Sequence, residues 1–184
     1  MRHWLLTSTT YGTWLPGDRR GFVSEVTDSG HRRVIHNTPG TPYDADMPAL
    51  ERAARQLQKG SAVWLDREHA SVLLAQFHET ATIRGWELLA VAILSNHFHV
   101  VVAAGDNVAA AQILGDLKSY GSRALNRRWG KPAGDTWWTV SGSKRPLPHE
   151  SAVLAAIRYV EQQHSPLVIW SRENSSTAQP EPRL

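Results

Sequence analysis

The chain has 184 residues, of which 41% are hydrophobic and eight are tryptophan, and its formal net charge is +3. This size and hydrophobic content predict one globular domain with its own core, and the absence of cysteine excludes disulfides, zinc–thiolate sites and thiol nucleophiles. No segment is typical of a signal peptide or a membrane span, so we expect a cytoplasmic protein without a membrane partner.

The first predicted elements are a strand and a long insertion. β-Branched and aromatic residues over 2–10 predict the strand. The residues that follow are rich in Pro-Gly and Ser-Gly turns, and the segment 18–65 is too long for a simple connection, so we expect an insertion there. Within it, residues 49–58 are predicted to form a helix.

A helix and a hairpin come next. Asp66 is a suitable N-cap for a helix over 66–84, and Gly85 is a typical residue to end it. The apolar stretch 86–94 and the β-branched stretch 97–104 predict two strands joined by a two-residue turn.

The last third of the chain predicts two helices around a short strand. We expect the helices over 107–129 and 149–163, and the strand over 137–140. The polar, proline-containing residues 171–184 predict a disordered tail. Residues 1–170 would then form the single domain.

The predicted order is strand, helix, strand, strand, helix, strand and a final helix. Its first six elements match the split βαββαβ arrangement, an antiparallel sheet with helices on one face. We therefore predict an α+β, ferredoxin-like (RRM-like) fold with an N-terminal insertion and an additional C-terminal helix.

Positive charge is concentrated after residue 117. One interpretation of this distribution is a surface that binds a polyanion such as nucleic acid. The other is an ordinary solvated basic surface. The residues concerned are Lys118, Arg123, Arg127, Arg128, Lys131, Lys144 and Arg145.

The most informative motif is Asn96-His97-Phe98-His99-Val100. Alternate side chains of a strand share a face, so His97 and His99 would be neighbours on one side of the sheet. Two buried imidazoles need partners, and they repel each other when both are protonated. A metal ion bound through their neutral nitrogens removes both problems. A structural pair that is hydrogen-bonded to the backbone or to water remains the alternative.

The final predicted helix carries a second pair of polar side chains. Tyr159 and Gln163 are four residues apart, so they would lie one turn from each other on one helical face. Val153, Ile157 and Val160 would form the buried stripe, which leaves the tyrosine and the glutamine at its edge. Taken alone, a tyrosine in such a position is usually a packing residue.

Together, the His-Phe-His motif and the later Tyr-x-x-x-Gln pattern resemble those of the single-tyrosine HUH transposases, the small insertion-sequence enzymes and their REP-associated relatives. The similarity covers roughly residues 2–12 and 66–165. It also includes the segments Thr9-Thr10-Tyr11-Gly12-Thr13-Trp14-Leu15-Pro16-Gly17-Asp18 and Trp138 with Ser141-Gly142-Ser143. The chain departs from the family pattern at Ser95, where many members have proline, and in the length of its insertion.

The resemblance implies a role for each of these residues. His97, His99 and Gln163 would bind Mg²⁺ or Mn²⁺, and Tyr159 would be the nucleophile. It also implies a homodimer that cuts and rejoins hairpin or repeat ends of single-stranded DNA through a covalent 5′-phosphotyrosine. A phenolate is a good leaving group, so strands can rejoin without ATP. The neutral ligand set would leave the charge of the ion facing the phosphate.

Other residues are candidates for the nucleophile and for DNA contacts. Tyr120 is the rival nucleophile, but Ala124 stands four positions later in place of a glutamine. If exposed, Trp14, Trp137 or Trp138 would stack on unpaired bases. We predict backbone contacts to DNA for a set of basic residues and one tyrosine: Lys118, Arg123, Arg127, Lys144, Arg145 and Tyr11.

Three other functions are alternatives to this interpretation. A non-catalytic or domesticated nucleic-acid-binding module of the same fold is the main alternative. A replication-initiator or relaxase nickase would share the chemistry, although many of these have the histidines and tyrosine in a different order or number. A zinc hydrolase of the His-x-His-x-Asp-His type is excluded because three valines follow His99.

Overall fold

The chain is built on a five-stranded antiparallel sheet with strand order β6-β1-β5-β4-β7. The computed structural model describes residues 1–20, 24–27, 33–36 and 46–173. The strands of the sheet are β1 (Arg2–Thr9), β4 (Glu87–Ile93), β5 (His97–Ala104), β6 (Ser143–Leu147) and β7 (Val168–Ser171).

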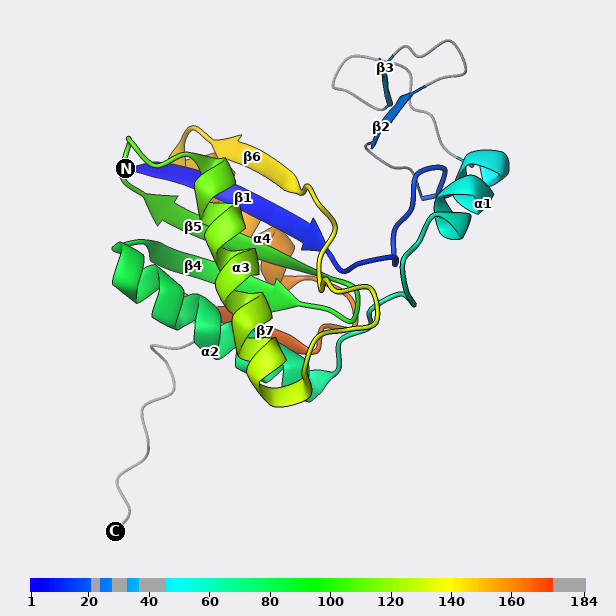
Figure 1. Cartoon of the computed structure of the whole chain (residues 1–184). Helices are drawn as coiled ribbons and strands as arrows, with labels where there is room; N and C mark the ends of the chain where they lie inside the picture. The colour runs from blue at the N-terminus through cyan, green and yellow to red at the C-terminus, as the bar shows by residue number, and fades with distance from the viewer. Residues whose placement is uncertain (21–23, 28–32, 37–45, 174–184) are drawn as a thin grey trace.

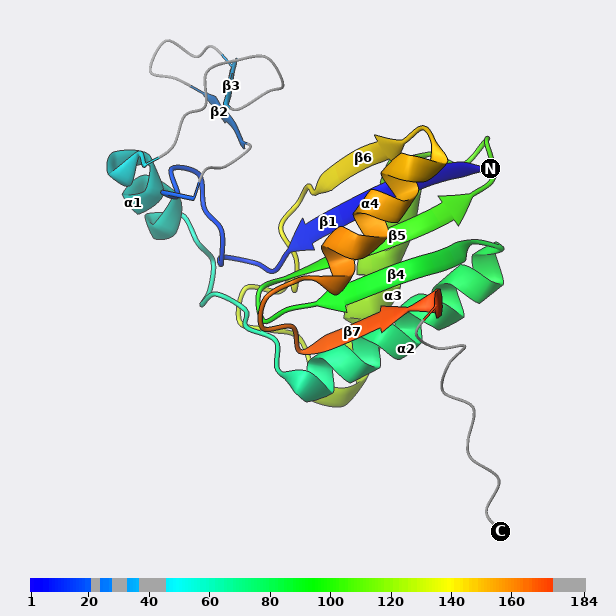
Figure 2. The ribbon, with the colours of Figure 1, turned by 180° about the vertical axis from the view of Figure 1, so that it is seen from behind.

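Helices cover both faces of this sheet. The helices α2 (Arg67–Arg84) and α3 (Ala110–Trp129) lie on the face toward the viewer in Figure 1. The helix α4 (Glu150–Glu161) crosses the opposite face, which Figure 2 shows in front. Within the described ranges, no helix combines the length and the apolar character needed to cross a membrane.

The insertion has its own small elements beyond the end of β1. Two short strands, β2 (Ser24–Thr27) and β3 (Arg33–His36), pair with each other and are followed by the helix α1 (Pro48–Gln56). The end of the predicted insertion belongs to the main fold, because Val63 and Leu65 are buried in the core.

The succession β1-α2-β4-β5-α3-β6 is the predicted βαββαβ order, so the α+β, ferredoxin-like prediction is confirmed. Local chemistry explains the sharp limits of α2. The Asp66 carboxylate accepts a hydrogen bond from the backbone N–H of His69, and the His69 ring accepts one from the backbone N–H of Asp66. Gly85 ends the helix in the left-handed conformation, with φ of 67°.

The strand β5 contributes to two different clusters of buried residues. Phe98, Val100 and Val102 point into the larger core under α2 and α3, where the rings of Phe98 and Phe77 meet at 5.0 Å. Val101 belongs to a smaller cluster under α4. The alternation of the strand therefore places His97 and His99 on the α4 side of the sheet.

The predicted strand over 137–140 is wrong. Trp138 forms only an isolated bridge to Thr10, and the strand β6 begins at Ser143. The two tryptophans at 137 and 138 have the composition of a strand but fill the core from a loop, with exposed fractions of 6% and 4%. The observed strand contains Pro146, which is tolerated because β6 is at the edge of the sheet.

The ends of the last elements also differ from the predicted ones. The helix α3 begins at Ala110 rather than at residue 107, and α4 ends at Glu161. The strand β7 is absent from the predicted elements, and it includes Ser171 of the predicted tail. Residues 174–184 of the predicted disordered tail lie outside the described residues.

We expect the Phe77→Ala variant to lower the free energy of unfolding by about 3–5 kcal/mol, because it empties a fully buried site against Phe98. Ile83→Ala, on the same helix but 74% exposed, should change it by about 0.5 kcal/mol or less. Urea denaturation of both variants measures the difference. Equal losses would contradict the assignment of the core to this face of α2.

Candidate active site

His97 and His99 lie side by side at the start of β5. Their ring centroids are 4.8 Å apart and the ring planes are inclined at 82°. The His99 side chain is buried, with 5% of its residue surface exposed, and His97 is half-buried. The prediction that the two imidazoles are neighbours on one face of the sheet is confirmed.

Each imidazole is oriented by an oxygen at its Nδ1 atom. The Asn96 Oδ1 atom lies 2.6 Å from His97 Nδ1, and the Thr7 Oγ1 atom lies 2.7 Å from His99 Nδ1. Thr7 reaches His99 because the two residues face each other in the register between β1 and β5. Neither bond uses the Nε2 atoms, so those nitrogens are the ones suited to bind a ligand.

Both histidines are held in the neutral form. Burial, and secondarily the neighbouring His97, lower the pKa of His99 from 6.5 to about 4. Burial also lowers the pKa of His97, and the positive charge of Arg20 acts in the same direction. At neutral pH both rings therefore have the lone pair that metal binding requires.

Tyr159 stands over this pair from α4. Its ring centroid is 5.2 Å from that of His99, with an edge-to-face angle of 75°. Its neighbours in the helix, Ala156 and Val160, are buried against the sheet, while Tyr159 itself remains 49% exposed. One chain thus brings together the predicted nucleophile and two of the three predicted metal ligands, His97 and His99.

Gln163 lies just beyond the end of α4. Its side-chain nitrogen donates to the carbonyl oxygen of Tyr159 at 3.0 Å, and no hydrogen bond between described residues joins it to either imidazole. Its side-chain oxygen is not used in that bond, so its role as third metal ligand stays a prediction. No group of three His, Cys, Asp or Glu side chains suited to a metal occurs among the described residues.

The donor set nevertheless fits a metal ion. Two neutral imidazoles lie next to each other with their Nδ1 atoms engaged, which is the arrangement in which Nε2 binds metals. Among the described residues, the amide of Gln163 is a candidate third donor, because its side chain lies against the backbone of Tyr159.

Tyr120, the rival nucleophile, is on the other side of the sheet. It belongs to α3, where the guanidinium groups of Arg123 and Arg84 lie 5.0 and 5.8 Å from its ring centroid. Its hydroxyl accepts a hydrogen bond from Arg84 at 3.4 Å. The sheet separates this tyrosine from the histidines, which favours Tyr159 as the nucleophile.

Lys118 stabilises a loop in this structure. Its ammonium group donates to the carbonyl oxygens of Thr139, Val140 and Ser141. Burial, together with the nearby Lys144, lowers its pKa to about 8. These three bonds use all the donors of the ammonium group, so a DNA contact at Lys118 stays a prediction that would require their exchange.

The other basic candidates are divided between the two faces. Arg123 and Arg127 belong to α3, where Arg127 donates to Gln76 at 3.2 Å. Arg145 pairs with Leu5 in the sheet, which places it on the α4 side with the histidines. Lys144, one residue earlier, faces the other way. Their contacts to DNA stay predictions, and Arg145 is the one on the face of the candidate site.

The aromatic candidates have packing roles here. Tyr11 lies against the core under α2 and α3, and its hydroxyl accepts a hydrogen bond from the backbone of Lys59 at 2.7 Å. A DNA contact at Tyr11 stays a prediction. Trp137 and Trp138 are buried, so the condition for base stacking is not met, while the ring of Trp14 lies under the guanidinium of Arg20 at 4.4 Å.

Three residues of the site were missed from the sequence. Thr7 and Asn96 orient the histidines, and Arg20 acts electrostatically on His97. Alternation along the predicted first strand indicates the face of the sheet on which Thr7 lies. Only the register of β1 against β5 shows which histidine it faces.

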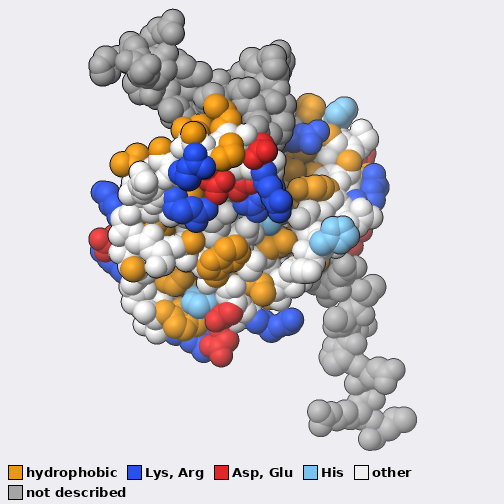
Figure 3. Space-filling view, turned by 90° about the vertical axis from the view of Figure 1, so that its right-hand side faces the viewer, with side chains coloured by type: hydrophobic (Ala, Val, Ile, Leu, Met, Phe, Trp, Pro, Cys, Tyr) orange, Lys and Arg blue, Asp and Glu red, His pale blue; other side chains and the backbone are white. Residues whose placement is uncertain are grey.

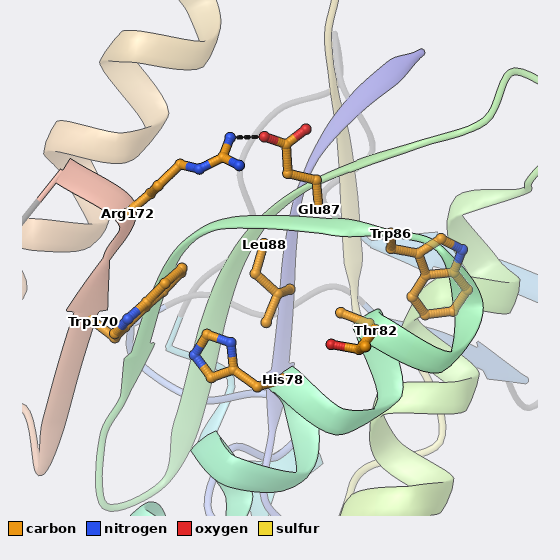
Figure 4. Close-up of a pocket in the computed structure, with 8 residues that line it drawn as sticks. His78, Thr82, Trp86, Glu87, Leu88, Trp170 and Arg172 are labelled. Carbon is orange, nitrogen blue, oxygen red and sulfur yellow. Dashed lines mark ion pairs between the residues drawn. The ribbon is translucent and has the colours of Figure 1, made fainter. Parts of the chain in front are cut away.

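One hollow of about 290 Å³ lies away from the candidate site. Figure 4 shows it between α2, β4 and β7, with an ion pair between Arg172 and Glu87 at its upper edge. Glu87 begins β4, whereas the end of that strand lies beside the histidines, so the hollow is at the opposite end of the sheet. Its lining includes His78, Thr82, Trp86, Leu88 and Trp170.

The family model described as "Transposase IS200 like" matches residues 57–163, which are 107 of the 184 residues. No curated protein matches the chain.

Two solved structures are similar to the chain. One is a REP-associated tyrosine transposase bound to a REP hairpin, with 11% identity, a TM-score of 0.46, and coverage of 86% of this chain and 64% of that chain. The chain thus spans less than two thirds of the length of that relative. The other is a candidate transposase from Deinococcus radiodurans R1, with 16% identity, a TM-score of 0.47, and coverage of 90% and 93%.

We expect the metal-free protein to lose stability as the pH falls from 6.5 to about 4. In that range the unfolded chain binds a proton at His99 that the folded chain does not, so unfolding is favoured, by about 3 kcal/mol for a shift of this size. Urea denaturation of the wild-type protein and of His99→Gln across this pH range isolates the effect of His99. Parallel pH profiles for the two proteins would contradict it.

Proposed function

Because the chain belongs to the family of IS200-like transposases, we propose that it cuts and rejoins single-stranded DNA at the site formed by His97, His99 and Tyr159. The observation that supports this proposal most strongly is the contact between the rings of Tyr159 and His99 at 5.2 Å. A half-exposed tyrosine beside two neutral imidazoles combines a nucleophile with candidate metal ligands.

The proposed reaction is a transesterification in two steps. The phenol oxygen of Tyr159 attacks the phosphorus of a phosphodiester and gives up its proton, and the bond from phosphorus to the 3′-oxygen breaks. The 3′-oxygen leaves and takes up a proton, and the 5′-phosphate stays on the tyrosine. A 3′-hydroxyl then attacks the phosphotyrosine, which restores a phosphodiester and releases the tyrosine.

We propose that His97 and His99 bind a divalent cation, Mg²⁺ or Mn²⁺, with Gln163 as the third protein ligand. When bound, such an ion polarises the scissile phosphate and offsets its negative charge. The residues of the chain have separate tasks around it: Asn96 and Thr7 hold the imidazoles, and α4 positions the phenol oxygen.

One chain contains the tyrosine and both histidines, which supports an active site assembled within a single protomer. The homodimer implied by the family resemblance stays a prediction. Hairpin or repeat ends of single-stranded DNA are the proposed substrate class, and hairpins from the genomic flanks of the coding sequence are the probes with which to begin.

We expect the wild-type protein, with Mg²⁺ or Mn²⁺, to form a DNA adduct that survives denaturation, and we expect Tyr159→Phe to form none, because it lacks the attacking oxygen. The adduct should also disappear on chelation. Gel electrophoresis of labelled hairpins measures it, with Tyr120→Phe as the matched control that keeps the adduct.

An adduct that persists in Tyr159→Phe and is lost in Tyr120→Phe would move the nucleophile to α3. Binding of hairpins without any adduct, with and without metal, would favour the alternative of a non-catalytic binding module of the same fold.

We expect Thr7→Val to weaken Mn²⁺ binding by about 10- to 100-fold, because the His99 ring loses the hydroxyl that orients it. Thr7→Ser, which keeps a hydroxyl, should bind nearly as well as the parent. Calorimetric titration with Mn²⁺ measures both variants. If Thr7→Val binds Mn²⁺ as tightly as the parent, the Thr7 hydroxyl does not support His99 as a metal ligand.

A further inference from the structure

Trp64 differs from the other tryptophans of the chain in its exposure. The other seven are buried or half-buried, whereas 60% of the surface of Trp64 is exposed. Among the described residues, its indole takes part in no hydrogen bond and no ring contact. A single apolar side chain at a surface needs no explanation by itself, so the position and the support of this indole decide what it can do.

The position of Trp64 is beside the histidine motif. The backbone N–H of the next residue, Leu65, donates to the carbonyl oxygen of Ser95 at 2.7 Å. Ser95 directly precedes Asn96, whose side chain contacts the ring of His97. A short path of bonded residues therefore connects the indole with a predicted metal ligand.

The indole points out of the molecule at this end of the sheet. Val63 and Leu65, on either side of Trp64, are both buried in the larger core, so the side chain between them is directed away from that core. Figure 3 looks onto this end, where hydrophobic side chains are visible at the surface among charged ones. A single strand of DNA that reaches the histidines from this end would pass an exposed aromatic ring.

The segment that carries the indole is held in place on both sides. The backbone N–H of Lys59 donates to the Tyr11 hydroxyl at 2.7 Å, and that of Val63 donates to the Tyr11 carbonyl oxygen at 2.8 Å. Gly60 packs closely against another loop, because a Cβ atom there would lie 2.5 Å from the backbone nitrogen of Gly134. Little backbone freedom therefore remains to be lost when a ligand binds.

We propose that Trp64 is a stacking platform for an unpaired nucleobase of the single-stranded DNA that reacts at the histidines. The proposal rests on the proposed function for the identity of its ligand. Every base has a π-face, so an indole can bind a single strand without selecting its sequence. A base fixed at this place restricts the position of the neighbouring phosphodiester, which favours its attack by Tyr159.

Equilibrium binding of a fluorescent oligothymidylate, measured by anisotropy at several salt concentrations, tests the platform. All variants are made in the Tyr159→Phe background, so that no chemistry contributes. We expect Trp64→Ala to weaken binding roughly 5- to 150-fold, the range for the loss of one base stack. The slope of log K against log salt should stay the same, because no phosphate contact is lost. Undiminished binding by Trp64→Ala, or no binding by the parent, would overturn the proposal.

Two other substitutions separate stacking from a general apolar contact. Trp64→Phe keeps an aromatic face and should keep most of the affinity, whereas Trp64→Leu should bind about as weakly as Trp64→Ala. Equal affinities of the phenylalanine and leucine variants would contradict stacking. Ile83→Ala is the matched control and should bind like the parent, because it removes an exposed apolar side chain at the end of α2 far from the histidines.

A contact between two copies of the chain is the other use for an exposed tryptophan. Sedimentation of the protein without DNA distinguishes the two. If Trp64→Ala converts the parent to a smaller species, the indole belongs to an interface and the proposal is wrong, whereas an unchanged mass with weakened DNA binding supports it. If the wild-type protein forms no adduct on any hairpin, the proposed function fails, while the Trp64 variants still decide on the platform.

Discussion

The two faces of β5 are the constraint on which the rest of the structure depends. Phe98, Val100 and Val102 must be buried under α2 and α3, and this fixes the strand's orientation with no freedom to rotate. His97 and His99 are thereby forced onto the other face. Because Ala90 and Ala92 of β4 are small on that face, α4 can approach closely and bring Tyr159 to the imidazoles.

Much of this arrangement was predictable from local patterns. The caps at Asp66 and Gly85 defined α2, and the alternation of β5 placed both histidines on one face, because these features depend only on neighbours in sequence. The strand at 137–140 was mispredicted because aromatic residues suit both a strand and a core-filling loop. The strand β7 is four residues long and carries too little pattern to recognise.

The partners within the site depend on register and on loop packing, which the sequence does not encode locally. Thr7 becomes the partner of His99 only through the pairing of β1 with β5. The basic residues after position 117 form one cluster along the chain, yet the sheet separates Arg123 and Arg127 of α3 from Arg145 of β6. Closeness in sequence could not distinguish the two faces.

The helix that carries Tyr159 connects the two outermost strands of the sheet. It follows β6 at one edge and leads into β7 at the other, so it spans the full width of the sheet and is anchored at both ends. Leu167 joins β4 through its backbone N–H, and the Ser171 hydroxyl donates to Glu161 of the helix. A large displacement of the whole helix would therefore have to break the bond from Leu167 to β4 or the bond from Ser171 to Glu161, so the placement of the phenol oxygen over the histidines depends on the pairing of an edge strand.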